Sequence, residues 1–182
     1  MYKFIIKCFL CSSIFFLLAG CTSTTTQKSK DSHLTIATIG SPPEITDQQI
    51  TFESISLQNL QNDTKQLSEK YDALFIMPKY LSDAANDVYI ASYEKLRIPT
   101  FFIESKKQEL PFINDDVSYE NAPQIDEVEY FATGYLNQPN EETDVSYMTW
   151  RYLQTSKSSA KALENVYKKI FQTIEDLKMS SR

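Results

Sequence analysis

Polar residues that could carry chemistry follow three apolar segments of the sequence, at the points where those segments give way to loops. Their hydroxyl, phenol and ammonium groups donate hydrogen bonds, and the ammonium groups add positive charge. Such a set suits a small anionic or hydroxylated ligand. The candidate ligand-binding residues are Ser41, Lys79, Tyr80, Ser105 and Lys106. The alternative interpretation, which the sequence alone favours, is that all of them are solvated loop residues.

Carboxylates form further clusters at Asp115-Asp116, Asp126-Glu127-Glu129 and Glu141-Glu142. Paired carboxylates can serve as the acids of a hydrolase or as calcium ligands. The spacing of an EF-hand loop is missing, so a solvated acidic surface is the favoured interpretation.

Aromatic residues near the C-terminus form another candidate surface, because their rings can stack on a sugar or a peptide. They are Tyr130, Tyr135, Tyr147, Trp150 and Tyr152. Half-buried core positions explain them at least as well.

Cysteine and histidine, the residues most used for nucleophilic and metal chemistry, are scarce. Cys8, Cys11 and Cys21 all precede the expected folded domain, and His33 is the only histidine. A domain without thiols excludes thiol nucleophiles, thiol redox chemistry and cysteine metal sites. Because His33 lies at the domain boundary, most Ser-His triads and zinc sites are also disfavoured. We therefore predict no catalytic residue, no metal ligand and no cofactor.

Phosphate-binding and hydrolase motifs are missing as well. The sequence has no G-x-G-x-x-G, Walker or G-x-S-x-G pattern, and only Gly40 and Gly134 follow Cys21. A loop that cradles phosphate needs more glycines than this.

Four of the candidate ligand residues, all except Ser41, follow strands of one unit. This unit is a strand, a crossover helix and a second strand within residues 71–105. Ala73–Met77 and Thr100–Ile103 are continuously apolar, as strands covered on both faces are. Apolar residues recur between them at helical spacing, with Ser82 as a candidate N-cap and Asp83 in the first turn. A crossover helix connects parallel strands, and ligands of parallel sheets bind beyond the carboxyl ends of those strands. The candidate residues would meet there.

The remaining pattern predicts two more strands, two helices and a hairpin. The expected ranges are strands at 33–39 and 50–57, helices at 59–70 and 158–178, a long loop at 106–126, and a hairpin of 129–136 with 145–153. The relative direction of the first two strands stays open, and a phase slip at Ser54 indicates a bulge or an edge strand. The run at 145–153 could equally begin a helix.

These elements predict an α/β fold. The expected architecture is a single three-layer domain with a mainly parallel central sheet flanked by helices, and an antiparallel edge hairpin as an option. The domain would span residues 34–182, with Phe75 and Phe102 buried at its centre.

The N-terminus has the pattern of a targeting segment. Lys3 and Lys7 precede a short apolar stretch, which ends in Leu18-Ala19-Gly20-Cys21. This resembles the bacterial lipoprotein signal, or lipobox. The resemblance implies that residues 1–20 are a signal peptide, that Cys21 is lipidated, and that the chain is cut just before it. An ordinary secretory signal with a coincidental cysteine is the alternative.

The polar residues 21–33 would then form a flexible tether between the lipid and the domain, with a reach of roughly 20 Å. Removing Lys3 and Lys7 changes the formal net charge from −6 to −8. Such an acidic domain argues against a nucleic-acid partner.

The sequence therefore predicts a lipid-anchored protein on the extracytoplasmic face of the cell membrane, held there through Cys21. Residues 71–111 also resemble small, uncharacterised lipoproteins of Gram-positive bacteria, which implies no activity. We expect a non-enzymatic binding or interaction module, whose partner is an envelope protein or a small ligand. The alternative is a small-molecule-binding or hydrolytic domain that uses a cleft at the carboxyl ends of the strands.

Overall fold

The structure, a computed structural model, describes residues 33–123, 130–138, 147–153 and 159–180. The predicted signal peptide, Cys21 and nearly all of the predicted tether lie outside the described residues. The carboxylates at 126–129 and 141–142 also lie outside them.

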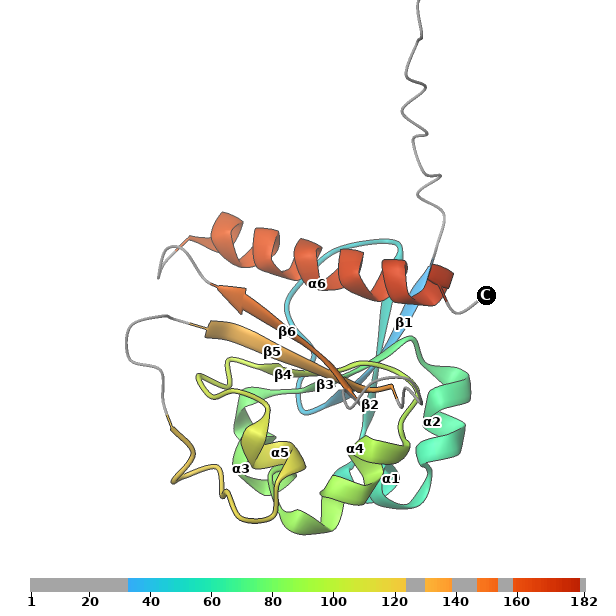
Figure 1. The fold of residues 1–182 in the computed structure, drawn as a ribbon. Coiled ribbons are helices and arrows are strands. Elements are labelled where there is room, and N and C mark those ends of the chain that lie inside the picture. The colour runs from blue at the N-terminus through green and yellow to red at the C-terminus, as the bar shows by residue number, and fades with distance from the viewer. Residues whose placement is uncertain (1–32, 124–129, 139–146, 154–158, 181–182) are drawn as a thin grey trace, which may run out of the picture. The chain divides into compact units, whose positions relative to one another are not determined.

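The described chain is an α/β domain with one six-stranded mixed sheet (Figure 1). In spatial order the strands are β2 (Ile50–Ile55), β1 (Leu34–Ile39), β3 (Ala73–Ile76), β4 (Thr100–Ile103), β5 (Tyr130–Asn137) and β6 (Tyr147–Leu153). The first four are parallel, and β5 and β6 run antiparallel to their neighbours. The predicted parallel centre and the antiparallel edge hairpin are both present.

The direction of β2, which the sequence left open, is parallel to β1. The two strands pair along their whole length without a register shift, so no bulge occurs at Ser54. The phase slip instead accompanies the position of β2 at the edge of the sheet. Residues 40–49 connect the two strands without a helix, and Ile45 packs partly buried against the core.

The predicted helices before and after β3 are each broken into short pieces. The helical elements are α1 (Leu57–Asn62), α2 (Thr64–Lys70), η1 (Pro78–Tyr80), α3 (Leu81–Ala84), η2 (Asp87–Tyr89), α4 (Ile90–Lys95), α5 (Leu110–Ile113) and α6 (Ala160–Ser180).

Polar side chains lie at several of these helix ends. Ser56 caps α1 through a capping box with Asn59, and Asp63 ends α1 with a φ of −122°. The Asn86 side chain accepts a hydrogen bond from the Val88 N–H and so begins η2 in place of a continuous helix. Such side chains compete with the helix for backbone donors.

The predicted N-cap at Ser82 is wrong. Tyr80 occupies the N-cap position of α3, and Ser82 lies inside that helix. Its hydroxyl donates to Glu120 Oε1 at 2.5 Å, so it ties α3 to a later loop. Asp83 does lie in the first turn, where the helix dipole favours an anion.

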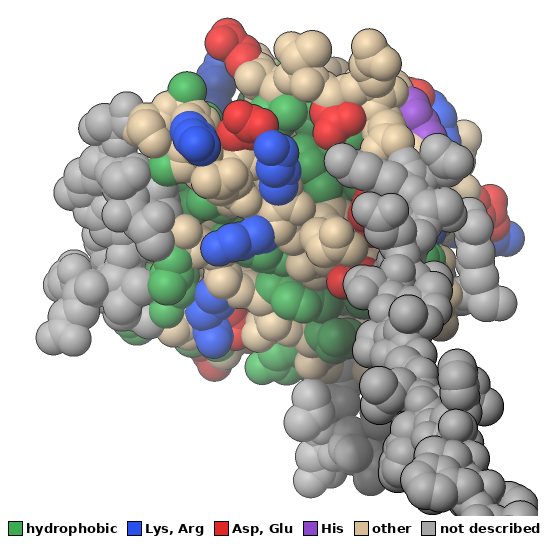
Figure 2. Space-filling model, turned by 90° about the horizontal axis from the view of Figure 1, so that it is seen from above, with side chains coloured by type: hydrophobic (Ala, Val, Ile, Leu, Met, Phe, Trp, Pro, Cys, Tyr) green, Lys and Arg blue, Asp and Glu red, His purple; other side chains and the backbone are tan. Residues whose placement is uncertain are grey.

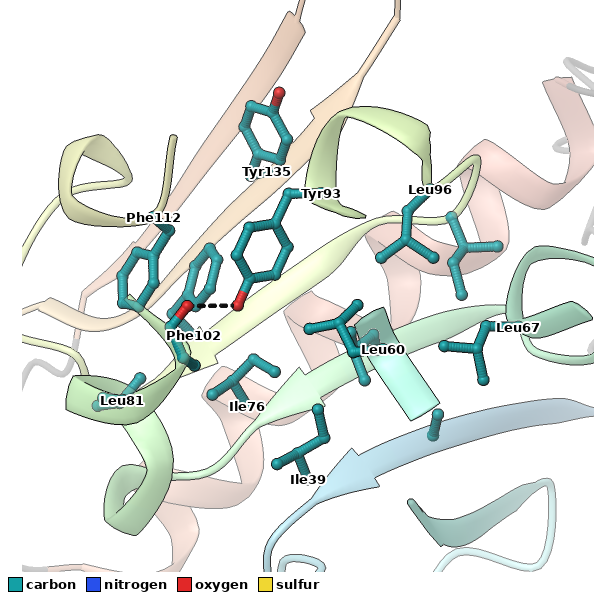
Figure 3. Packing of buried hydrophobic residues seen from close by; sticks show 14 of the residues in the cluster. Ile39, Leu60, Leu67, Ile76, Leu81, Tyr93, Leu96, Phe102, Phe112 and Tyr135 are labelled. Atoms are coloured by element: carbon teal, nitrogen blue, oxygen red, sulfur yellow. Dashed lines mark hydrogen bonds between the residues drawn. The ribbon is translucent and has the colours of Figure 1, made fainter. Parts of the chain in front are cut away.

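Two hydrophobic clusters lie on opposite faces of the sheet, because alternate strand residues point to opposite sides. The α1–α5 cluster contains Phe102, Phe112 and Tyr93, and the buried Tyr93 hydroxyl donates to Ala84 O at 2.8 Å (Figure 3). The α6 cluster contains Phe75 and residues of α6. Phe75 and Phe102 are both fully buried, as predicted.

The C-terminal segments settle the remaining alternative. Residues 147–153 form strand β6, and the predicted last helix is α6, with 21 residues. The residues that α6 buries are Val166, Tyr167, Ile170, Phe171 and Ile174. Leu163, one turn before Tyr167, is exposed.

Candidate functional site

The predicted ligand residues follow the carboxyl ends of β1, β3 and β4. Parallel pairing of these strands brings their ends to one edge of the sheet. Ser41, Lys79 and Lys106 are exposed, Tyr80 is partly buried, and Ser105 is fully buried. The five residues therefore share an edge but differ in what a ligand could reach.

At the ends of β1 and β3, where the crossovers change direction, Gly40 lies close to Met77 and Tyr80. Gly40 has a φ of 110°, and a Cβ there would lie 2.8 Å from Met77 Cβ and 3.1 Å from a ring carbon of Tyr80. Lys79 Nζ in turn lies 5.8 Å from the centre of the Tyr80 ring. These groups occupy the position where an open sheet receives a ligand.

Ser105 has a structural role in the loop after β4. Its hydroxyl donates to Lys107 O at 2.6 Å and accepts from the Lys107 N–H at 3.3 Å. Its carbonyl accepts from the Tyr119 hydroxyl at 2.5 Å. Glu104 and Lys106 on either side have positive φ values of 54° and 51°. The Ser105 hydroxyl is thus engaged in a tight turn.

One depression lies at the opposite edge, before β3 and β4, with a volume of about 540 Å³. Its lining includes Lys70, Asp72, Arg97 and Lys178. Lys178 Nζ lies 2.8 Å from Asp72 Oδ1, and the other Asp72 oxygen accepts from the Thr35 N–H at 2.8 Å. Much of its charge is therefore neutralised within the chain.

A second depression, of about 690 Å³, lies between α3, η2 and the loop at 118–120. Asp83, Asp87 and Glu120 make it acidic, and the hydrogen bond from Ser82 lowers the pKa of Glu120. None of the five predicted ligand residues lines either depression.

The surface seen from the side of α6 is mixed, with basic and acidic side chains interspersed among hydrophobic and polar ones (Figure 2). Lys168 and Glu164, one turn apart on α6, form an exposed ion pair. An outer helix face of this kind is typical of a solvated surface.

The outer edge of β6 is different, because β6 has only one neighbouring strand in the part of the chain that the structure describes. β6 pairs with β5 and ends the sheet. Within the described residues, no other backbone hydrogen bond involves residues 147–153. In an antiparallel ladder, alternate N–H and C=O groups of an edge strand point away from the neighbouring strand and can pair with another chain.

The side chains of β6 are mostly apolar. The strand reads Y-M-T-W-R-Y-L. It has no lysine, proline or carboxylate, residues that discourage an edge strand from pairing with another chain. Tyr147, Met148 and Leu153 are large hydrophobic residues that expose 39%, 38% and 45% of their surface. Trp150 is partly buried, with its ring centre 6.3 Å from that of Phe101.

Two polar contacts fix β6 to the body of the domain. Arg151 Nη2 lies 3.3 Å from Glu109 Oε1, and the Glu109 side chain is only 7% exposed. The Tyr152 hydroxyl donates to Thr173 Oγ1 of α6 at 2.8 Å. Burial raises the pKa of Tyr152 to about 12, so the hydroxyl stays a donor at neutral pH. The edge is therefore a firmly held strand that is open to further pairing.

Comparisons with known proteins supply no identity for this chain. No protein family, curated protein or solved structure matches it. In the part of the chain that the structure describes, no cluster of three or more His, Cys, Asp or Glu residues could hold a metal ion. The helices of that part include none that is long and apolar enough to cross a membrane.

The sequence did not identify the β6 edge as a surface, although its aromatic candidates include residues of this strand. Tyr135 and Tyr152 are buried in the core, whereas Tyr147 at the start of β6 is exposed. The option of an antiparallel edge hairpin did place this strand near a margin of the sheet. It did not indicate that the margin itself could bind another chain.

Proposed function

We propose that this protein is a membrane-anchored extracytoplasmic lipoprotein, whose domain is a non-enzymatic interaction module at the cell envelope. The outer edge of β6 is the interacting surface. The observation that carries this proposal is that β6 combines a backbone edge paired with no other described strand and three exposed large hydrophobic residues. Extended chains bind such edges through backbone hydrogen bonds, while side chains add specificity.

The anchor is the second part of the proposal. Its support is the match of Leu18-Ala19-Gly20-Cys21 to the lipobox, with lysines and an apolar stretch ahead of it. Two acyl chains on Cys21 would give stable anchoring, where a single chain is marginal. The domain would then be held near the membrane through residues 21–33.

We also propose that the domain has three layers, with α6 on one side of the sheet and α1–α5 on the other. The support is that the buried residues divide into two clusters, which contact different helices.

Cysteine substitutions test the anchor. Cys21→Ser should release the protein from the membrane fraction or leave the signal uncleaved. Cys11→Ser, a matched change within the apolar stretch, should leave fractionation and processing as they are. If the two variants fractionate and are processed alike, Cys21 is not the anchor.

Site-specific photo-crosslinking in intact cells tests the interaction surface. A photoreactive residue in place of Met148 on β6 should form protein adducts with the full-length lipoprotein. The same residue in place of exposed Thr51 on β2 should form few. The absence of adducts from position 148, or equal yields from both strands, would contradict the assignment of β6.

Small-ligand binding is the second candidate function, and the depression of about 540 Å³ at the amino ends of β3 and β4 favours it. This volume falls within the range of small-molecule sites. Arg97 supplies an exposed guanidinium that suits a carboxylate. Calorimetric titration with di- and tricarboxylates should show binding that Arg97→Gln removes. No heat of binding with the unmodified protein would rule out this class of ligand.

A further inference from the structure

The sequence of β6 is complementary to itself, and we infer that its partner is β6 of a second copy of this chain. This inference rests on the proposed interaction function and names the partner for that same edge. Two copies related by a two-fold axis would present the same strand to each other, as in an isologous dimer. Their β6 strands would pair antiparallel and join the two sheets.

The pairing register follows from the side chains. With the axis at Trp150, all seven residues of β6 acquire a partner, and each apolar residue faces another apolar residue. The cross-strand pairs are Tyr147 with Leu153, Met148 with Tyr152, Thr149 with Arg151, and Trp150 with its own copy. Directly opposed residues of this kind are the main source of side-chain stabilisation between antiparallel strands.

Burial of exposed apolar surface adds a second reason. Tyr147, Met148 and Leu153 are among the large hydrophobic residues that the described surface exposes, and all three lie on this strand. The register covers each of them with a residue of the other copy. Removing apolar surface from water favours association by about 25 cal/mol per Å².

Charge does not oppose the pairing of two β6 strands, although it disfavours contact between two copies elsewhere. The whole chain is acidic, with a formal net charge of −6, so two copies repel each other over most of their surfaces. β6 has no carboxylate, and its one charged residue, Arg151, is already balanced by Glu109. In the inferred register Arg151 faces the neutral Thr149, so no like charges stand directly opposite each other.

The test measures self-association of the full-length chain in detergent by sedimentation equilibrium. The unmodified protein should form dimers. Thr149→Lys places a lysine opposite Arg151 twice in each dimer and should weaken dimerisation about tenfold. Thr149→Glu places a carboxylate opposite Arg151 instead and should not weaken it. Ser54→Lys, on the exposed side of β2, should have no effect.

Trp150 gives an independent readout, because it is the only tryptophan of the chain and lies at the inferred axis. Dilution of the dimer should expose it to water and shift its emission to longer wavelength. Thr149→Lys should show the shift at higher protein concentration than the unmodified chain. If Thr149→Lys fails to fold by circular dichroism, Met148→Lys replaces it, since it changes a more exposed position on the same edge.

The possible outcomes separate this inference from the proposed function. A chain that stays monomeric at every concentration overturns the inference. A dimer that responds equally to Thr149→Lys and Thr149→Glu, or to Ser54→Lys, also overturns it, because association then does not use this register. If position 148 crosslinks only to a different protein, the interaction module stands and the second copy is wrong. If it forms no adduct at all, both fail.

Discussion

The two edges of the sheet are built in opposite ways. β2, at one edge, carries Glu53, which binds Lys70 Nζ and accepts a hydrogen bond from the Tyr71 hydroxyl at 2.9 Å. Its apolar residues are all partly buried. β6, at the other edge, has no carboxylate and exposes three large hydrophobic residues.

This difference shows which edge is closed to other chains. A charged side chain on an edge strand makes it costly for another strand to pair there, because pairing would bury the charge. Glu53 has this effect on β2. The one charged residue of β6, Arg151, is already paired with the nearly buried Glu109, and β6 also exposes three large hydrophobic residues. This contrast supports the proposed use of the β6 edge.

The largest effect on stability should come from Phe75, which connects both edges through the centre of the sheet. Its ring lies 6.0 Å from Phe52 of β2 and 5.6 Å from Phe101, which in turn contacts Trp150 of β6. Phe75→Ala should lower the free energy of unfolding by about 3–5 kcal/mol. Urea denaturation would measure this, with Lys106→Ala on an exposed loop as the control. Equal midpoints for the two variants would show that Phe75 is not central.

The second largest effect on stability should come from the ion pair at the β6 edge, which should contribute more than the ion pair at the β2 edge. Arg151→Ala leaves the Glu109 carboxylate almost buried without its cation, and should cost about 1–3 kcal/mol. Lys70→Ala should cost less, because Lys70 and Glu53 are both well exposed and water screens their attraction. Urea midpoints of the two variants at neutral pH give the comparison. A larger loss for Lys70→Ala would reverse our view of which edge is held more firmly.

A smaller effect is expected from the hydroxyl that joins β6 to α6. Tyr152→Phe removes the donor to Thr173 Oγ1 and should cost about 1 kcal/mol, with the ring packing retained. Thermal unfolding would detect the change. Tyr80→Phe, at a hydroxyl outside both edges, is the matched control. A Tyr152→Phe variant as stable as the unmodified protein would mean that β6 is held by packing alone.

The smallest effect should be a pH dependence at the β2 edge. Hydrogen bonds from Lys70 and Tyr71 hold the pKa of Glu53 below its ordinary value of 4.5. A depressed pKa in the folded state gives stability that is present above pH 4.5 and is lost as the pH falls through the lower, folded value. Glu53→Gln should therefore flatten the decline in urea midpoint below pH 4.5. If the urea midpoint of Glu53→Gln declined below pH 4.5 as it does in the unmodified protein, the hydrogen bonds to Glu53 would contribute nothing to stability.

Much of the fold could be predicted from residue patterns within short segments. The continuous apolar runs at Ala73–Met77 and Thr100–Ile103 identified the parallel centre, because strands covered on both faces need no alternation. In residues 158–178, apolar residues recur every three or four positions and identified α6, since a helix buries one stripe of side chains. The break at Asn86 was missed, because capping by a polar side chain leaves the apolar spacing nearly unchanged. The break at Asp63, where no side chain caps the next helix, was missed as well.

For the candidate ligand-binding site, too, the placement of the residues could be predicted and their contacts could not. The order of the elements placed Ser41, Lys79, Tyr80, Ser105 and Lys106 at one end of the parallel strands, and the structure agrees on that placement. What those side chains contact depends on residues distant in sequence. The Ser105 carbonyl accepts from Tyr119, and Tyr80 packs on the backbone of Gly40.

The sequence by itself determined most of the strands and the last helix, the parallel centre and the lack of thiols and histidine pairs in the domain, because each depends on composition or on local spacing. Only the tertiary structure decided which strands lie at the edges. The order of strands in a sheet depends on pairing between segments far apart in the chain, such as β1 between β2 and β3. The same apolar strand is core when it has two neighbours, and a binding surface when, like β6, it has one.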